Sequence, residues 1–599
     1  MGYGARARRV PALGGASLTD VDIYRLLLLC KTERGLVNSS GNTFVQDEIY
    51  SMNDYYPKCG GFNNSYYGPY VAQSFFDELE NDLSCEMKVL NFVDDAAVQA
   101  TYSIMDGATP AVKIFDIKAG RLSLNDKSAF GNKIGIKITQ KEDITMKLTA
   151  EVLDTATSCV LDNVDNLEVG NYIKFTEGSS TEVRVITGIT PSTKTITFAA
   201  ISESAGFSVS GTTVSRIDWK LEIAVKDDLG DYQKKEEWTL PFAKSDTIGM
   251  AKEVNDTESG SDFVVLAVNS SNSSNPEDQI PAELSSWTPL TGGSDGSAPG
   301  DSDWNTLAET YLSSETFTIM LAPESSSITH NDNMVSFCTD GYKGIFYCQA
   351  ANSANEATLK NFGGSLRGSV RFGMIPGDKW IKLTDPTVVS GTKDVPKVGI
   401  DAASWFNTFS RFGEAKVAAG NRSEMVLRTR GKLVDNGLTH DDSLGVGDRL
   451  IRNYSVNICK FRRGIGITNN SARTLSTDDG YKYQNQIMQS LLYSRSIVAY
   501  LRNIEQDKSG IDSQRSHYNE VWAYMKNKYN DGKLYQGQKE DGSLTQFSDV
   551  CIIKNDFSVN TLADINNGIE VIFMQFVAPP PIEEPILSFA SASVTTVRG

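Results

Sequence analysis

The chain has 599 residues and a net charge of −18, with 57 Lys and Arg against 75 Asp and Glu, and 40% of its residues are hydrophobic. This length exceeds what one hydrophobic core supports, so several domains are expected, and the composition excludes a disordered chain. The acidic balance argues against direct nucleic-acid binding, and the chain lacks the roughly 20 consecutive apolar residues of a membrane span, so no membrane insertion is expected.

Residues 1–50 are predicted to form an N-terminal arm and a helix that belong to the core. The helix is expected over 18–31, because Val21, Tyr24, Leu27 and Leu28 recur at helical spacing. Residues 51–130 are predicted to form an outer α/β module.

Residues 131–268 are expected to be β-rich. Ile134, Ile136 and Ile138 alternate with polar residues or glycine, which predicts a half-buried strand. Turn residues separate further strand patterns at 169–175, 183–189, 193–198 and 219–225. A small β-barrel inserted at about 159–215 explains this spacing.

Residues 269–303 resemble a Ser/Asn/Gly-rich linker that contains the sequence LTGGSDG at 290–296. This stretch matches G-x-S-x-G, in which Ser294 would be the nucleophile of a hydrolase. A hydrolase needs a strand that enters this turn and a helix that leaves it directly, whereas Pro289 precedes it and the next helical pattern begins near 304. We therefore predict no catalytic residue and no enzyme, with a serine hydrolase kept as an alternative.

Metal and cofactor sites are not predicted either. The eight cysteines are scattered without a C-x-x-C pair, which favours reduced, mostly buried thiols over zinc ligands or a disulfide framework. The chain has only three histidines, His330, His440 and His517, and each is expected to be an ordinary surface residue.

Residues 304–420 are predicted to form an α/β middle domain, with a helix at 304–312 and strands at 317–321 and 343–348. Residues 421–599 are predicted to form a C-terminal domain with long helices at 480–503 and 516–530. Strands at 550–553 and 569–577 follow, and the apolar composition of the second places it inside a sheet. The three prolines at 579–581 then lead into an extended arm at 586–597.

The order of these elements resembles the contractile tail sheath proteins of phages and of phage-derived injection systems. The similar stretches are SAFGNKIGIKI at 128–138, with Gly131 and Asn132; EWTL at 237–240; LTGGSDG, with Leu290, Gly292, Gly293, Asp295 and Gly296; the regions 402–420 and 445–467; RTL at 473–475, with Arg473; and the strand at 568–577. Each stretch alone is unspecific, and the resemblance lies in their order.

The resemblance implies an α+β, multidomain fold with a common α/β sheath core. In that fold the C-terminal half and the N-terminal segment build the core, β-rich outer domains are inserted, and terminal strands join a neighbour's sheet. The residues expected in this assembly are Ile569, Val571, Phe573, Ile586, Leu587 and Phe589. A strand that closes its own domain remains the alternative for this segment.

The function implied by the resemblance is that of a sheath subunit, which polymerises helically around an inner tube and contracts to drive the tube through a target envelope. The implied partners are further copies of the chain, the inner tail tube protein, and baseplate and tail terminator proteins. The implied location is a virion tail assembled in the host cytoplasm, or a cytoplasmic or extracellular contractile injection particle. Ser/Thr/Asn-rich β segments leave a static surface-layer protein or adhesin as another alternative.

Overall fold

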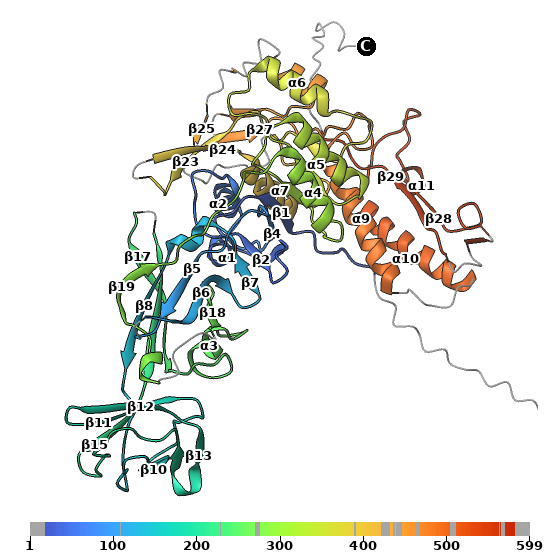
Figure 1. Cartoon of the computed structure of the whole chain (residues 1–599). Helices are drawn as coiled ribbons and strands as arrows, with labels where there is room; N and C mark the ends of the chain where they lie inside the picture. The colour runs from blue at the N-terminus through green and yellow to red at the C-terminus, as the bar shows by residue number, and fades with distance from the viewer. Residues whose placement is uncertain are drawn as a thin grey trace, which may run out of the picture.

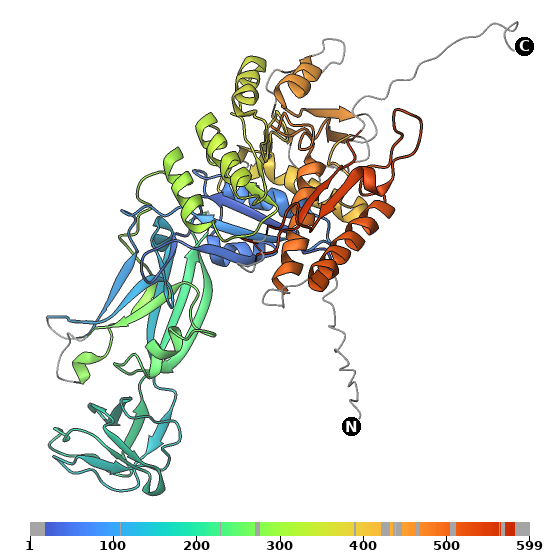
Figure 2. The ribbon, with the colours of Figure 1, turned by 90° about the vertical axis from the view of Figure 1, so that its right-hand side faces the viewer.

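The computed structural model describes residues 18–107, 110–227, 229–269, 276–388, 391–420, 432–434, 438, 446–462, 466–503, 511–561, 563–564 and 569–581. Within these ranges helices and strands are mixed, which confirms the predicted α and β composition. Figures 1 and 2 show most of the helices gathered at one end of the molecule and two β-rich modules extending from them.

The centre of the helical end is a six-stranded sheet with the order β22-β21-β20-β1-β4-β3. Strand β1 pairs in parallel with both β20 and β4, whereas β3 is antiparallel to β4. The N-terminal part of the chain therefore lies in the middle of the sheet. The strands are β1 (Arg25–Cys30), β3 (Val45–Ile49), β4 (Glu86–Asn91), β20 (Ile319–Leu321), β21 (Ile345–Tyr347) and β22 (Gly373–Met374).

The helix predicted over 18–31 is wrong, because residues 25–30 form strand β1. Leu26, Leu27, Leu28 and Leu29 are all completely buried. A central parallel strand is covered on both faces and reads as a continuous apolar run, which on periodicity alone cannot be distinguished from a buried helix.

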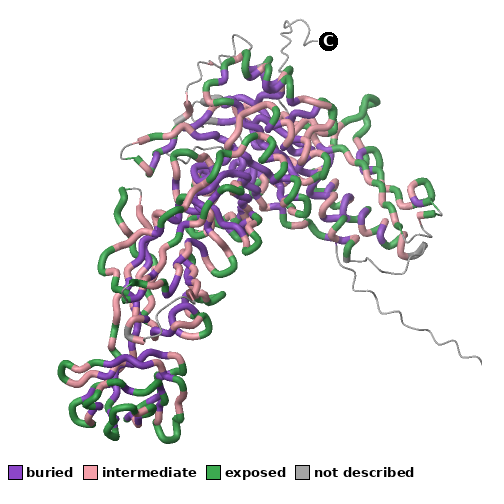
Figure 3. The backbone as a smooth tube through the Cα atoms, viewed as in Figure 1, coloured by how far each residue is buried: buried purple, intermediate pink, exposed green. Residues whose placement is uncertain are grey.

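Helices pack around this sheet, and buried residues concentrate where they meet it (Figure 3). α2 packs on α7 and contacts β1, while α5 packs on α4, α6 and β21. The predicted helix near 304–312 and the strands near 317–321 and 343–348 are confirmed by α4, β20 and β21. The helices are α1 (Met52–Cys59), α2 (Gly68–Glu78), α4 (Asp301–Tyr311), α5 (Ile328–Asp340), α6 (Glu356–Leu366) and α7 (Val398–Phe412).

A middle β module follows, with two sheets ordered β17-β16-β8-β19 and β18-β6-β7-β2, and with β5 paired to β6. The predicted strands near 134–138 and 219–225 are confirmed as β8 and β16, and β19 lies within the segment expected to be a linker. The elements are β2 (Leu36–Asn38), β5 (Thr101–Met105), β6 (Lys113–Arg121), β7 (Leu124–Asp126), β8 (Ile134–Lys141), β16 (Asp218–Lys226), β17 (Tyr232–Pro241), α3 (Gly249–Val254), β18 (Val264–Val268) and β19 (Leu284–Pro289).

A distal β module is inserted between β8 and β16 and lies at the far end of the molecule from the long helices (Figures 1 and 2). It has a hydrophobic cluster of its own, in which Phe175 packs against Phe198 and Phe207. Its strands are β9 (Thr145–Lys147), β10 (Ser158–Val160), β11 (Tyr172–Glu177), β12 (Ser180–Val185), β13 (Gly188–Thr190), β14 (Thr195–Thr197) and β15 (Thr212–Arg216).

The C-terminal part adds two long helices and a terminal hairpin, which confirms the helices predicted near 480–503 and 516–530 and the strand near 550–553. The elements are β23 (Ile381–Asp385), β24 (Gly391–Val395), β25 (Lys432–Leu433), α8 (Val446–Tyr454), β26 (Cys459–Arg462), β27 (Gly466–Asn469), α9 (Gln484–Asn503), α10 (Ile511–Asn530), α11 (Phe547–Val550), β28 (Cys551–Lys554) and β29 (Phe573–Phe576).

Candidate assembly surface

Strands β28 and β29 form a two-stranded antiparallel sheet beside α10. Cys551 pairs with Phe576 and Ile553 with Met574, and because side chains alternate along a strand, these residues share the face that packs on the hydrophobic core. The Phe576 ring lies 5.1 Å from that of Tyr493 on α9. The hairpin is therefore attached to the long helices through one face.

The opposite face of the hairpin is open to solvent and carries exposed apolar side chains beside the polar Lys554 and Gln575. Phe573 is 43% exposed, Ile552 44%, Val571 38% and Ile569 49%. The expectation that composition places the last strand inside a sheet is thus wrong for this chain by itself. A contiguous row of exposed apolar side chains is typical of an interaction surface.

Within the described residues, neither outer edge of this hairpin carries a third strand, and β28 and β29 pair only with each other. An open edge presents backbone N–H and C=O groups that accept an added strand. The apolar face and the open edges together form what we call the assembly hairpin, residues 551–554 and 569–577.

Polar side chains hold the assembly hairpin against α10. Glu570 accepts a hydrogen bond of 2.6 Å from the Asn555 side chain and lies 3.0 Å from Nδ1 of His517. The amide of Asn555 also donates to the Gln514 carbonyl at 3.0 Å, and Asn560 pairs with both backbone groups of Val571. These contacts fix the position of the segment that enters β29.

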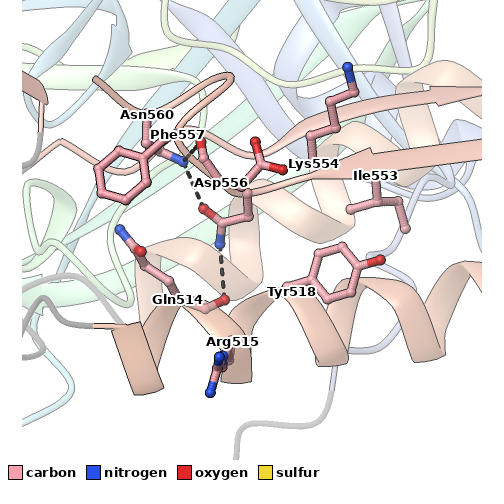
Figure 4. A pocket seen from close by; sticks show the side chains of 9 residues that line it. Gln514, Arg515, Tyr518, Ile553, Lys554, Asp556, Phe557 and Asn560 are labelled. Atoms are coloured by element: carbon pink, nitrogen blue, oxygen red, sulfur yellow. Dashed lines mark hydrogen bonds between the residues drawn. The ribbon is translucent and has the colours of Figure 1, made fainter. Parts of the chain in front are cut away.

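An open hollow of about 350 Å³ lies between α10 and the end of β28. Figure 4 shows Gln514, Arg515 and Tyr518 on the helix side, with Ile553 and Lys554 coming from the strand. The hollow lies beside the hairpin, and its lining carries the positive charges of Arg515 and Lys554 and the negative charge of Asp556.

The two Gly-containing motifs from the sequence meet in the middle β module, although they are far apart in the chain. The Asn132 side chain donates to the Gly293 carbonyl at 2.8 Å and accepts from the Gly293 N–H at 2.9 Å. A Cβ on Gly293 would lie 2.5 Å from the Ser128 carbonyl, and one on Gly131 would lie 2.6 Å from the Ala100 Cβ. These glycines are needed for close packing between backbone segments.

Asp295 links this junction to the central sheet domain. Its carboxylate accepts from the Ala129 N–H at 2.8 Å and from the Tyr66 hydroxyl at 2.7 Å. Burial raises the pKa of Tyr66, and Asp295 adds to this shift. Gly292 and Gly296 have φ of 83° and 66°, a backbone region that favours glycine.

Leu290 and Arg473, two further residues of the sequence motifs, both take part in packing. Leu290 is fully buried in the hydrophobic cluster of the middle β module. Arg473 exchanges hydrogen bonds with Asn457 through its backbone, and its guanidinium lies over the ring of Tyr483, 5.7 Å from the centroid. The structure therefore brings together the motifs at 131–132 and 290–296, while Arg473 lies elsewhere, next to the start of α9.

A buried carboxylate supports the start of α2 close to this junction. Glu324 accepts backbone hydrogen bonds from Tyr67 at 2.9 Å and from Gly68 at 2.9 Å. Burial raises the pKa of Glu324 to about 7, while these N–H groups and the nearby Lys393 oppose the rise. Burial also lowers the pKa of Lys393, whose Nζ donates to the carbonyl of Tyr66 at 2.7 Å.

Ser294 lacks the surroundings of a nucleophile. It forms an antiparallel bridge with Val98, and its N–H donates to the Val98 carbonyl at 3.0 Å, so the strand-turn-helix geometry is absent. Neither described histidine contacts it. His330 packs against Trp304 and Phe346, and His517 lies beside Glu570.

The prediction that all histidines lie at the surface is wrong for two of them, because His330 and His517 are both buried. Burial lowers the pKa of His330, which favours its neutral form. His440 lies outside the described residues, as do Ile586, Leu587 and Phe589 of the predicted assembly set.

The described residues contain no group of three or more His, Cys, Asp or Glu side chains arranged to hold a metal ion. All eight cysteines are free and buried, as predicted from their spacing. No helix in the described ranges is both long and apolar enough to cross a membrane.

Sequence reasoning missed the anchor at the start of the described chain. Asp20 accepts from the Tyr524 hydroxyl and from Nζ of Lys528, both at 2.6 Å, and Lys528 also pairs with Glu414 at 3.0 Å. The Val21 N–H donates to Oγ of Ser496 at 3.1 Å. The sequence signal here is limited to an acidic residue after Ser17 and Thr19. Such a signal does not identify Lys528, which lies 508 residues away in the chain.

Searches of protein-family models and of curated proteins find no match. Among solved structures, a sheath tail protein from Desulfitobacterium hafniense is 10% identical, with a TM-score of 0.45 and 93% of each chain covered. The sheath complex of the extracellular contractile injection system PVC, in its contracted state, is 16% identical, with a TM-score of 0.39 over 49% of this chain and 75% of that chain. The helical sheath of the anti-feeding prophage, also contracted, is 14% identical, with a TM-score of 0.38 over 50% of this chain and 77% of that chain.

Proposed function

We propose that this chain is a structural subunit of a contractile tail sheath, which polymerises helically around an inner tube and contracts to drive that tube through a target envelope. The observation that carries the proposal is the assembly hairpin, whose apolar outer face and two open edges are exposed in a single copy. The ordered series of family-like sequence stretches supports the same function.

A chain segment added to an open edge links one copy to the next through backbone hydrogen bonds. Residues 586–597 follow three prolines and are suited by composition to be that segment. A contact between two different surfaces, repeated with rotation and rise, generates an open helix rather than a closed ring. Contraction is then a change between two packings of nearly rigid subunits.

The proposed partners are further copies of the chain, an inner tail tube protein, and baseplate and tail terminator proteins. The proposed location is a virion tail or a contractile injection particle. The free energy for contraction comes, on this proposal, from a larger interface in the contracted packing, so no nucleotide is consumed.

No observation favours a serine hydrolase, because Ser294 lies in a backbone bridge and neither of the described histidines contacts it. A static surface-layer protein or adhesin would also expose β surfaces. That function would not require the ordered series of sheath-like sequence stretches. It also predicts assemblies whose length never changes.

Negative-stain microscopy of the purified chain tests the proposal. Hollow striated tubes are expected at high protein concentration. A monodisperse monomer under conditions in which the protein is folded would overturn the proposal.

A truncation tests the role of the terminal segment. Deleting residues 585–599 is expected to leave a soluble, folded protein that no longer forms tubes. As a matched control for length, a full-length variant with Ile586, Leu587 and Phe589 all changed to Ser retains the backbone and loses the apolar side chains. Normal tubes from both variants would exclude strand donation by this segment.

A further inference from the structure

A second hollow, of about 400 Å³, lies between α9 and the chain segments at the starts of β1, β20 and β21, and three arginines line it. We call it the arginine hollow and define it by Arg25, Arg495, Arg502, Val21, Val498 and Tyr342. Residues 21 and 25 come from the start of the described chain, Tyr342 from the loop before β21, and the remaining three from α9. The arginine hollow therefore lies next to the anchor formed by Asp20.

Three residues of α9 point into the arginine hollow because of their spacing. Arg495, Val498 and Arg502 are separated by three and four residues, which places them on one face of a helix. Val498 is 45% exposed, and Tyr342 on the opposite wall is 53% exposed. The hollow thus combines an apolar floor with positive charge.

Arg25 and Arg495 both line the hollow, and the positive charge of one acts on the other. Arg495 donates to the carbonyls of Phe317 and Lys343 at 2.7 and 2.5 Å, so neutral acceptors hold it in place. Burial, together with the positive charge of Arg25, lowers the pKa of Arg495 to about 10. Repulsion between two such groups is relieved when an anion binds between them.

The nearby carboxylates neutralise this charge only in part. Glu86 lies 3.4 Å from Nε of Arg25, while the Arg25 NH1 group donates to Thr316 at 2.9 Å. Asp22 also lines the hollow, so the three arginines face two carboxylates and the balance stays positive. Arg502 is exposed at the rim and can turn toward an incoming group.

We infer that the arginine hollow binds a carboxylate side chain presented by a second copy of this chain. The apolar walls receive the stem of that side chain, and the guanidinium groups bind its charge. A copy of the chain is the occupant favoured by charge, because the chain carries −18 overall and its surface therefore offers many carboxylates to a basic hollow.

This contact joins two different surfaces and is separate from the assembly hairpin. The inference builds on the proposed function, because in an open helical polymer the same contact between unlike surfaces repeats from one copy to the next. The contact supplies side-to-side attraction between copies that strand addition alone does not provide, and it weakens as salt screens the charges.

The test is a charge reversal at the rim combined with site-specific cross-linking. Arg502→Glu is expected to lower self-association of the full chain at least tenfold at low salt, measured by sedimentation velocity. Lys252→Glu makes the same change in net charge at an exposed position on α3, and it is expected to have little effect. Equal weakening by both variants, or by neither, would overturn the inference.

A photo-reactive phenylalanine analogue at Val498 identifies the occupant directly. In the purified chain, cross-links to an Asp- or Glu-containing segment of a second copy are expected. Cross-links only within one copy, or capture of a different protein in assembled particles while copies remain unlinked, would overturn the inference.

The two proposals fail separately. If Arg502→Glu forms normal striated tubes and Val498 captures no second copy, the arginine hollow is not a contact, whereas the sheath function stands. If the wild-type chain forms no tubes but Val498 still captures a second copy, the sheath function fails and the contact stands. A wild-type chain that never self-associates removes both.

Discussion

Asn132 and Gly293 are 161 residues apart in the sequence and exchange two hydrogen bonds, one in each direction. A side-chain amide is the right group for this contact, because it carries both a donor and an acceptor and so pairs with the C=O and the N–H of one residue. The Gly131-Asn132 turn and the GGSDG stretch are therefore two halves of one junction. Ser294 lies in this junction and contributes its backbone N–H, which donates to the Val98 carbonyl.

Asn132→Ala tests the junction. The substitution removes both hydrogen bonds and leaves the Gly293 backbone groups unpaired, so a loss of about 1–3 kcal/mol in stability is expected. It should appear as a lower melting temperature for the transition that includes the middle β module. Ser294→Ala is the matched control and should change stability by less than about 0.5 kcal/mol. Equal melting temperatures for both variants would contradict this role for Asn132.

Local patterns in the sequence were enough for much of the fold. Alternating Ile134, Ile136 and Ile138 identified β8, and sustained helical periodicity identified α9 and α10. The run Leu26–Leu29 was misinterpreted, because burial on both faces removes the periodicity that separates a strand from a helix. Its position between β4 and β20 is set by pairing with distant strands, which no local pattern contains.

The candidate site could be predicted only in part for the same reason. The apolar composition of 569–577 was visible, but the exposure of its outer face depends on which parts of the chain pack against it, and composition does not contain that information. The contact of Glu570 with His517 and Asn555 joins three elements through side chains that are unremarkable in sequence. The arginine hollow likewise combines residues from positions 25 and 502.

Phe573→Ser tests the outer face of the assembly hairpin. Phe573 is substantially exposed in one copy, so the folded monomer should lose less than about 0.5 kcal/mol of stability, while tube formation should be abolished. Microscopy and a melting curve on the same sample separate the two effects.

Met574→Ser is the control for that experiment. Met574 is on the inner face and packs against the core, so this change should destabilise the monomer itself, by about 2 kcal/mol. Tubes of normal yield from Phe573→Ser would show that the outer face is not an assembly surface.

The distal β module should be removable as a unit. Lys141 and Asp218 are direct partners across β8 and β16, so replacing residues 142–217 with Asn-Gly closes a two-residue hairpin at the same register. The shortened chain should remain folded with a lower melting temperature, because the excised Tyr172 ring lies 4.5 Å from Phe242 in the part that remains.

Residues 142–217 expressed alone should also fold, since they have their own hydrophobic cluster. Circular dichroism and melting curves on both pieces check the expectation. A shortened chain that is soluble yet lacks a cooperative transition would show instead that the distal and middle modules fold as one.

Glu324 should make stability depend on pH. Its pKa is raised to about 7 in the folded protein, above its ordinary value of 4.5, so the folded state binds the proton more tightly than the unfolded state. Its contribution to stability is therefore fully present below about pH 4.5 and is lost as pH rises through about 7, with a total of about 3 kcal/mol. Glu324→Gln should remove this component, seen as the difference between wild-type and variant urea unfolding curves from pH 4 to pH 8.

Glu258→Gln, at an exposed position in the loop after α3, should leave the pH profile unchanged. If the free energies of unfolding of wild type and Glu324→Gln change in parallel from pH 4 to pH 8, the expectation is wrong. The Tyr67 and Gly68 N–H groups, with Lys393, then keep the Glu324 carboxylate charged throughout.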